Sequence, residues 1–184
     1  QSTVILNAAD KRTVNGLLNT NGTQSDDSTT YNLAAADDFI ADRTAGDSSD
    51  TTGNAITVSN VVSPQITSAA YDATTGALVV TGTNFVHAAG AANDVDVSLL
   101  TLTGEGGASY AITSTSDVEI TSATQFSVTL TGQDQTHING LLNKNGTSSD
   151  DATTFNLAAA DNWMAGAAAN DDIADTTGNG VTVS

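Results

Sequence analysis

Hydrophobic and polar residues alternate with a period of two over several short stretches of this chain. Such alternation places successive side chains on opposite faces and predicts β-strands. Gly-, Asp- and Thr-rich segments separate the stretches and are typical of turns. The predicted strands cover residues 65–67, 77–81, 95–102, 110–113, 118–120, 126–130 and 180–183. Strands with this spacing indicate an all-β fold of the β-sandwich type.

Two short helices per repeat are expected to interrupt the strands. In the first, Ile138, Leu141 and Leu142 lie at positions i, i+3 and i+4 and form one apolar helical face. Thr131 and Asp134 precede this face and resemble a capping box, which predicts that the helix begins there.

The second helix is expected over 157–164, where Ala160, Trp163 and Met164 form an apolar stripe. Both helices are expected to pack on the core of the sandwich. Trp163, the single tryptophan, is therefore predicted to be buried.

A long internal repeat organises the chain. Residues 1–59 recur as residues 125–184, with a shift of about 124 positions and more than half of the aligned residues identical. In the first copy the sequence reads VNGLLNTNGTQSDDSTTYNLAAADDF, and in the second it reads INGLLNKNGTSSDDATTFNLAAADNW. Residues 60–124 occur once. The chain is thus predicted to contain the C-terminal half of one repeat, 1–59, followed by one complete repeat, 60–184.

The half-copy is expected to be incomplete by itself. Half a sandwich would expose unpaired strand edges and half of a hydrophobic core. Either preceding sequence of a longer protein or a neighbouring chain is expected to complete residues 1–59. The chain starts at Gln1 without an initiator Met or a cationic signal sequence, so either processing removed its beginning or it is a segment of a longer protein, and the repeat favours the second.

The charge of the chain excludes some classes of partner. Four Lys and Arg residues stand against 21 Asp and Glu residues, for a formal net charge of −17. So acidic a surface repels phosphate backbones and anionic membranes, which argues against nucleic-acid binding. No apolar run is long enough to cross a bilayer, so no membrane insertion is expected. The chain has no cysteine, which excludes disulfides and thiolate metal sites.

Enzymatic activity is not expected. A nucleophilic hydroxyl needs a neighbouring base, and the only histidines are His87 and His137. The first copy has Thr13 where the second has His137, so the repeat does not depend on that histidine. The Gly-rich segment 104–107 lacks the Lys of a phosphate-binding loop and is interpreted as a tight turn.

Repeated acidic loops are the strongest candidates for a ligand site. Ca²⁺ takes six to eight oxygen ligands from Asp, Asn, Ser, Thr and backbone carbonyls. The loops 47–54 and 171–179 supply such ligands twice. Asp and Asn also stabilise turns without a metal, so a purely structural role stays open. The predicted Ca²⁺ ligands are Asp47, Asp50, Asn54, Asp171, Asp172, Asp175, Asn179, Asp94, Asp96, Asp26, Asp27, Asp150 and Asp151.

The complete repeat resembles a known class of bacterial repeats. Residues 66–85 read ITSAAYDATTGALVVTGTNF, and residues 94–114 read DVDVSLLTLTGEGGASYAITS. Together they resemble repeats of very large bacterial surface and adhesin-like proteins, and the first stretch resembles the immunoglobulin-like IPT/TIG fold. The resemblance implies immunoglobulin-like β-sandwiches in tandem, export, an extracellular or cell-surface location and no catalytic residues.

Three functions are compatible with these features. The first is a structural or adhesive extender repeat of a secreted bacterial surface protein, rigidified by Ca²⁺ and contacting neighbouring repeats. The second is a subunit of an extracellular filament or surface layer, in which identical subunits complete the half-copy. The third is a carbohydrate-binding module that stacks sugars on aromatic rings, for which the candidates are Trp163, Tyr110 and Tyr71.

Overall fold

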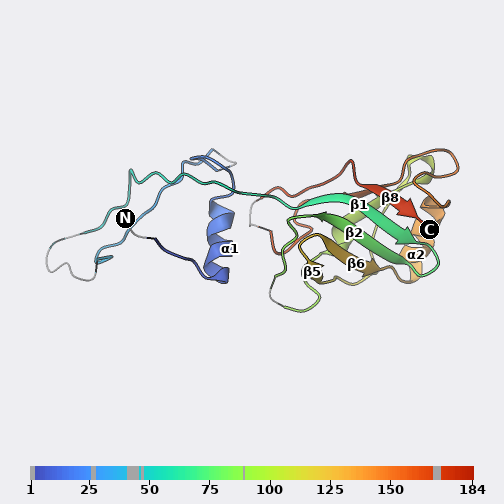
Figure 1. Cartoon of the computed structure of the whole chain (residues 1–184), viewed down its shortest axis with the longest axis horizontal. Helices are drawn as coiled ribbons and strands as arrows, with labels where there is room; N and C mark the ends of the chain where they lie inside the picture. The colour runs from blue at the N-terminus through green and yellow to red at the C-terminus, as the bar shows by residue number, and fades with distance from the viewer. Residues whose placement is uncertain (1–2, 26–27, 41–45, 47, 89, 168–170) are drawn as a thin grey trace. The chain divides into compact units, whose positions relative to one another are not determined.

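The computed structural model describes residues 3–25, 28–40, 46, 48–88, 90–167 and 171–184. The chain forms two compact units (Figure 1). Unit 1 comprises Gln1–Val62 and Ala168–Asp171, and unit 2 comprises Ser63–Ala167 and Asp172–Ser184. All extended strands of the described residues belong to unit 2.

Unit 2 is built on a single curled sheet. Its strands are β1 (Gln65–Asp72), β2 (Ala77–Thr83), β3 (Leu100–Thr103), β4 (Ser109–Ala111), β5 (Ile120–Ser122), β6 (Gln125–Thr129), β7 (Asn156–Ala159) and β8 (Gly180–Val183). Their order in the sheet is β4-β3-β7-β8-β1-β2-β6-β5. Only β1 and β8 pair in parallel, so the sheet is mixed (Figure 1). The protein is therefore strand-rich, and the all-β expectation is confirmed at this level.

The central hairpin of β1 and β2 follows directly from its sequence. Leu78 and Val80 in β2 are buried, and the residues between them are half-buried, as a strand with one core-facing side requires. Asp72 begins the turn, and its Oδ1 accepts hydrogen bonds from the backbone N–H groups of Thr74 and Thr75. Gly76 closes the turn at a φ of +73°, where a Cβ would lie 2.6 Å from a backbone oxygen. Glycine is required at this position.

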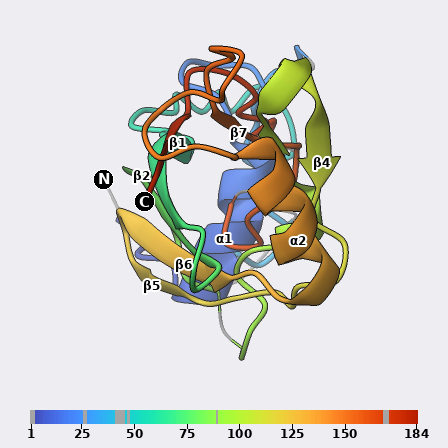
Figure 2. The same cartoon turned by 90° about the vertical axis from the view of Figure 1, so that its right-hand side faces the viewer.

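The first predicted helix is confirmed. α2 (Gly132–Leu141) begins after Thr131 and buries Ile138, and it lies next to β3 and β4 (Figure 2). The capping-box prediction is wrong, because the Thr131 side chain makes no capping hydrogen bond. Two short 3-10 helices, η1 (Val97–Leu99) and η2 (Glu105–Gly107), also occur, and η1 interrupts the strand predicted over 95–102.

The second predicted helix is wrong. Residues 157–159 belong to β7, which pairs antiparallel with β3. Leu157 and Ala159 are buried while Ala158 is half-buried, so the burial follows the period of a strand. Consecutive alanines favour a helix locally, but pairing with β3 overrides that preference.

The core of unit 2 centres on Trp163, which is buried as predicted. Its ring lies 5.6 Å from that of Phe85 in an edge-on arrangement and 5.8 Å from that of Phe126. The indole Nε1 donates a hydrogen bond to the carbonyl of Ile173 at 2.9 Å. The largest side chain of the core is therefore packed and hydrogen-bonded at the same time.

Unit 1 contains one helix and a set of isolated β-bridges among its described residues. α1 (Ala8–Leu17) begins after Asn7, whose side chain accepts a hydrogen bond from the backbone N–H of Asp10. The bridges follow the helix and pair Gly22 with Val58, Gln24 with Thr30, Asn32 with Ala55, and Ala35 with Asp50.

The same pairs recur in unit 2 at the positions that the repeat makes equivalent. They are Gly146 with Val183, Ser148 with Thr154, Asn156 with Gly180, and Ala159 with Asp175. Shifts of 124 positions before the one-residue gap and 125 after it relate the two sets. The two copies therefore share one backbone plan, but in unit 1 nothing corresponds to β1–β5 among the described residues.

Candidate functional site

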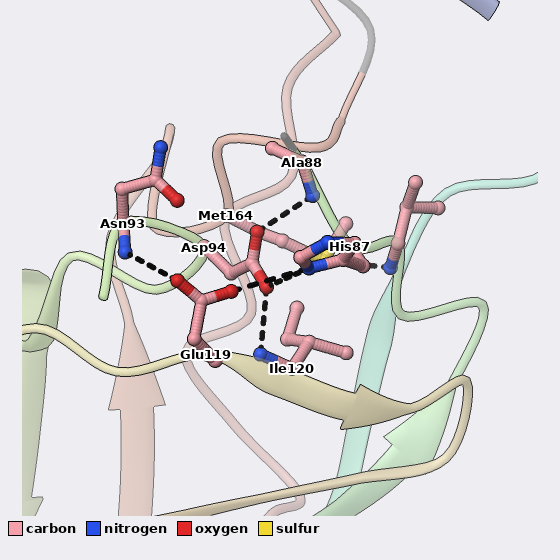
Figure 3. Close-up of polar contacts among 8 residues, drawn as sticks. His87, Ala88, Asn93, Asp94, Glu119, Ile120 and Met164 are labelled. Carbon is pink, nitrogen blue, oxygen red and sulfur yellow. Dashed lines mark hydrogen bonds and ion pairs between the residues drawn. The ribbon is translucent and has the colours of Figure 1, made fainter. Parts of the chain in front are cut away.

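Three ionisable side chains of unit 2 meet in one cluster (Figure 3). His87 and Asp94 lie in the loop after β2, and Glu119 immediately precedes β5. A bridge between Val95 and Val118 holds the two segments together, with the Val95 N–H donating to the Val118 carbonyl at 3.0 Å. His87 Nδ1 lies 2.7 Å from Asp94 Oδ2 and 3.2 Å from Glu119 Oε2.

Asp94 is the structural centre of this cluster. Its side chain is fully buried, with 0% exposure. Oδ1 accepts a hydrogen bond from the backbone N–H of Ala88 at 2.6 Å, and Oδ2 accepts one from Ile120 at 2.7 Å. The carboxylate thus fastens the loop to β5, and Figure 3 shows it between His87 and the two backbone donors.

The contacts within the cluster shift the pKa values of Asp94 and His87. Burial opposes ionisation of Asp94, but hydrogen bonds from His87, Ile120 and Ala88 outweigh it and hold the pKa of Asp94 below its usual range. The hydrogen bond with Asp94, followed by the charges of both carboxylates, raises the pKa of His87. The proton on His87 therefore lies between two anions.

This arrangement can hold one positive charge. A protonated imidazole donates from Nδ1 to Asp94 Oδ2 and forms an ion pair with Glu119 Oε2, which accounts for both short distances. Imidazole with two carboxylates is also a donor set that Zn²⁺ accepts, although the ion would have to displace that proton. Among the described residues, the contacts of the His87 ring are with the two carboxylates and not with a hydroxyl.

A shallow depression of about 350 Å³ lies beside the histidine. Most of its lining is apolar or small, and the polar side chains come from only three of its residues. The lining residues are Phe85, Val86, His87, Ile120, Thr121, Ser122 and Ala123.

Comparison with known proteins returns no relative. No family model, no curated protein and no solved structure matches the chain. In the described part of the chain, no helix has the length and hydrophobicity that crossing a bilayer requires.

In the predicted calcium loops, Asp and Asn side chains hydrogen-bond with each other. Asn179 Nδ2 donates to Asp175 Oδ1 at 2.9 Å, and Asp175 Oδ2 accepts from the backbone N–H of Ile66 at 2.8 Å. In the other copy, Asn54 Nδ2 donates to Asp50 Oδ1 at 2.9 Å. These hydrogen bonds explain why Asp and Asn recur four residues apart without requiring a metal.

The remaining predicted ligands are distributed over separate turns. Asp96 caps η1 through Ser98, and Asp172 accepts from the N–H of Ala174. The Asp151 carboxylate accepts hydrogen bonds from the backbone N–H of Gly106 and from a backbone N–H of its own turn. Asp150 Oδ1 lies 3.9 Å from Lys144 Nζ. Asp171 is half-buried, and Asp26, Asp27 and Asp47 lie outside the described residues.

Among the described residues, the cluster of His87, Asp94 and Glu119 is the one group of three His, Asp or Glu side chains within reach of a single ion. Of the predicted calcium ligands, it includes only Asp94. Calcium binding in the acidic loops stays a prediction.

The aromatic residues do not form an exposed stacking surface in the described part of unit 2. Trp163 and Tyr71 are buried, and the Tyr71 hydroxyl donates to Asn139 Oδ1 at 2.6 Å. Tyr110 is half-buried and stacks on the ring of His137 with centroids 4.6 Å apart. A sugar would find no free face on Trp163 or Tyr71, which leaves Tyr110 as the partly exposed ring among the three candidates, and carbohydrate binding stays a prediction.

Sequence reasoning missed Glu119 and the role of His87. Asp94 and Glu119 are 25 residues apart, and the bridge between Val95 and Val118 together with the hydrogen bond from Ile120 to Asp94 brings them close. No local spacing encodes that pairing, so no sequence motif pointed to it.

From the contacts of this cluster we expect the stability of the fold to depend on pH through the titration of His87. The pKa of His87 is raised in the folded state, so its protonated form stabilises the fold. This stabilisation is fully present at any pH below the ordinary His pKa of about 6.5. This contribution is lost as the pH rises through the raised pKa. Thermal unfolding followed between pH 6 and pH 9 should show the melting temperature of the wild type falling, and His87→Ala should flatten that part of the profile.

The other histidine provides the control for this measurement. His137→Ala leaves the three-residue cluster intact, so its pH profile should follow that of the wild type. If both variants keep the slope, or both lose it, the ion pair of His87 is not its source.

Proposed function

We propose that this chain is a structural extender repeat of a secreted bacterial cell-surface protein, built from immunoglobulin-like β-sandwich units in tandem and without catalytic activity. The observation that carries the proposal is the shared backbone plan of the two copies. Four equivalent pairs of residues bridge in each copy, although the sequences differ at many positions. A chain that repeats one fold unit is organised for length and for contact between neighbours.

Several features of unit 2 support the sandwich. β7 and β8 pair through a single pair of residues, Asn156 and Gly180. The sheet is therefore held together there by a short strand contact. On one side of this joint lie β4, β3 and β7, and on the other lie β8, β1, β2, β6 and β5. Leu102 and Leu157 from one side share a hydrophobic cluster with Val80 and Val128 from the other. Two strand groups around one core are typical of a sandwich.

Composition is compatible with this role. The net charge of −17 favours solubility and opposes non-specific association, and the absence of cysteine makes folding independent of disulfides. Calcium would screen the acidic loops where repeats follow one another and would stiffen the array. Adhesion would then be the task of another part of the protein, which the repeats hold away from the cell.

The test is the length of an array. Further copies of residues 60–184 are joined to Ser184, and small-angle scattering measures the maximum dimension as the copy number increases. In Ca²⁺ the dimension should grow in proportion to the copy number, and chelation should shorten the particle and lower its melting temperature. Replacing Ca²⁺ by Mg²⁺ at equal ionic strength is the control.

Two outcomes contradict the proposal or a part of it. A dimension that stays nearly constant as copies are added means that the repeats collapse onto one another and do not extend. A dimension that grows but ignores chelation keeps the extender role and removes calcium from it.

A further inference from the structure

Unit 1 exposes large apolar side chains at positions that are buried in unit 2. Phe39 is 56% exposed and Leu33 is 62% exposed, whereas their equivalents Trp163 and Leu157 are both fully buried. Val4, Leu6 and Ile40 are exposed as well, and their equivalents Val128, Leu130 and Met164 are buried. The equivalents belong to one hydrophobic cluster in unit 2, so we call this set the open face; it consists of Val4, Leu6, Leu33, Phe39 and Ile40.

Unit 2 shows what covers the equivalent positions. There β3 pairs with β7 and places Leu102 opposite Leu157. β1 pairs in parallel with β8. The ring of Phe85 packs edge-on against Trp163. All three covering elements come from residues 60–124, the part of the repeat that the chain contains once.

Polar groups point to the same missing partner. In unit 2 the buried carboxylate of Asp134 on α2 accepts hydrogen bonds from residues of the segment 110–115, and Asp175 accepts one from Ile66. Their equivalents in unit 1 are Asp10 and Asp50, and both are exposed. The half-copy therefore keeps the acceptors and lacks the segment that supplies the donors.

Exchange of N-terminal halves between identical chains does not complete every half-copy. Each chain of this sequence has two C-terminal halves, 1–59 and 125–184, but only one N-terminal half, 60–124. In an assembly of identical chains, one C-terminal half per chain therefore lacks a 60–124 segment, whether or not halves are exchanged. Residues 60–124 of a second copy do not suffice to cover every half-copy.

We propose that the open face binds a further half-repeat of the type of residues 60–124, presented in the same polypeptide as it is in unit 2. The incoming segment adds one strand antiparallel to residues 32–35 and one parallel to residues 55–58, and it buries Phe39 against an aromatic ring. The covering segment of unit 2 is continuous with its C-terminal half. A covalent link of the same kind would hold the incoming segment near residues 1–59 at a high effective concentration. The inference rests on the repeat architecture of the proposed function.

The experiment extends the full chain by one half-repeat. A copy of residues 60–124 is joined to Gln1, in the same junction that Thr124 forms with Gln125. Phe39→Trp places a reporter on the open face in both the extended and the original chain. Wild-type Trp163 is buried and gives the reference for a protected indole. Acrylamide quenching measures the exposure of the introduced tryptophan, and hydrogen exchange measures the amides of residues 55–58.

In the original chain, the introduced tryptophan should be quenched readily at all protein concentrations. In the extended chain, that quenchable component should be lost and exchange at residues 55–58 should slow. A matched control carries Leu100→Asp and Leu102→Asp in the added copy only, and these charges prevent its packing on residues 32–35. The control should quench like the original chain.

Each other result overturns the inference. A quenchable tryptophan and fast exchange in the extended chain mean that the added half-repeat does not order on the open face, and an added segment that stays unfolded has the same meaning. Protection in the original chain means that the chain already covers the face itself, or that a second copy does so if protection rises with concentration. Protection in the aspartate control means that the contact is not strand addition.

Failure here is distinct from failure of the extender role. Arrays lengthened at Ser184 grow by complete repeats, so their scattering does not depend on the state of residues 1–59. A linear increase in dimension together with an uncovered open face would keep the proposed function and remove only this inference.

Discussion

Replacement of Asp134 by alanine is expected to lower the free energy of unfolding of unit 2 by about 3–5 kcal/mol. The Asp134 side chain is fully buried at 0% exposure on α2. Its Oδ1 accepts from the Tyr110 hydroxyl at 2.8 Å and from the N–H of Thr113 at 3.1 Å. Its Oδ2 accepts from the N–H of Ser114 at 2.8 Å and from Thr115 Oγ1 at 2.7 Å. Truncation leaves these donors without their acceptor.

The same carboxylate makes the fold sensitive to acid. Burial raises the pKa of Asp134, but hydrogen bonds from Thr115, Ser114, Tyr110 and Thr113 outweigh it and hold the pKa far below its usual range. A depressed pKa in the folded state contributes stability above the ordinary Asp value of about 4, and this contribution is lost as the pH falls through the folded value. The wild type should therefore lose more stability than Asp134→Ala between pH 5 and pH 2.

The internal repeat supplies a matched control for this variant. Asp10 is the equivalent residue in unit 1, where it is exposed and hydrogen-bonds Asn7. Urea unfolding followed by the fluorescence of Trp163 reports on unit 2. Asp10→Ala should leave the free energy of unfolding derived from that transition unchanged within about 0.5 kcal/mol. Equal losses for both variants would show that the hydrogen bonds to residues 110–115 do not stabilise the fold.

Replacement of Trp163 by alanine is expected to cost about 3–5 kcal/mol of unfolding free energy, the range for large aromatic side chains removed from a core. The indole is fully buried and packs against Phe85 and Phe126. Its loss also leaves the carbonyl of Ile173 without the Nε1 donor. Circular dichroism during thermal or urea unfolding measures the effect, since the variant has no tryptophan.

The control for this variant lies at the equivalent residue of the half-copy. Phe39→Ala removes a ring that is already more than half exposed, so the cost should stay within about 0.5 kcal/mol. If Trp163→Ala and Phe39→Ala proved similar in cost, either the core of unit 2 would be looser than its packing implies or the ring of Phe39 would be covered in solution.

Parts of this fold could be predicted because local pattern decided them. The strands around 77–81, 126–130 and 180–183 and the helix before Leu142 follow from alternation and helical spacing alone. The repeat by itself identifies the equivalent residues of the two copies, since sequence identity at many positions needs no knowledge of contacts. By contrast, the alanines of 157–160 favoured a helix that pairing with β3 excluded.

The sequence by itself determined that the chain is strand-rich, acidic and repetitive, and that its two C-terminal halves share one plan. Only the tertiary structure decided that Asp94 and Glu119 enclose His87, that Asp134 binds residues 110–115 and that the apolar positions of residues 1–59 are left uncovered. The physical reason is the range of the interactions. Periodicity and identity depend on neighbouring residues, whereas these contacts join segments tens of residues apart, and strand pairing sets which of them meet.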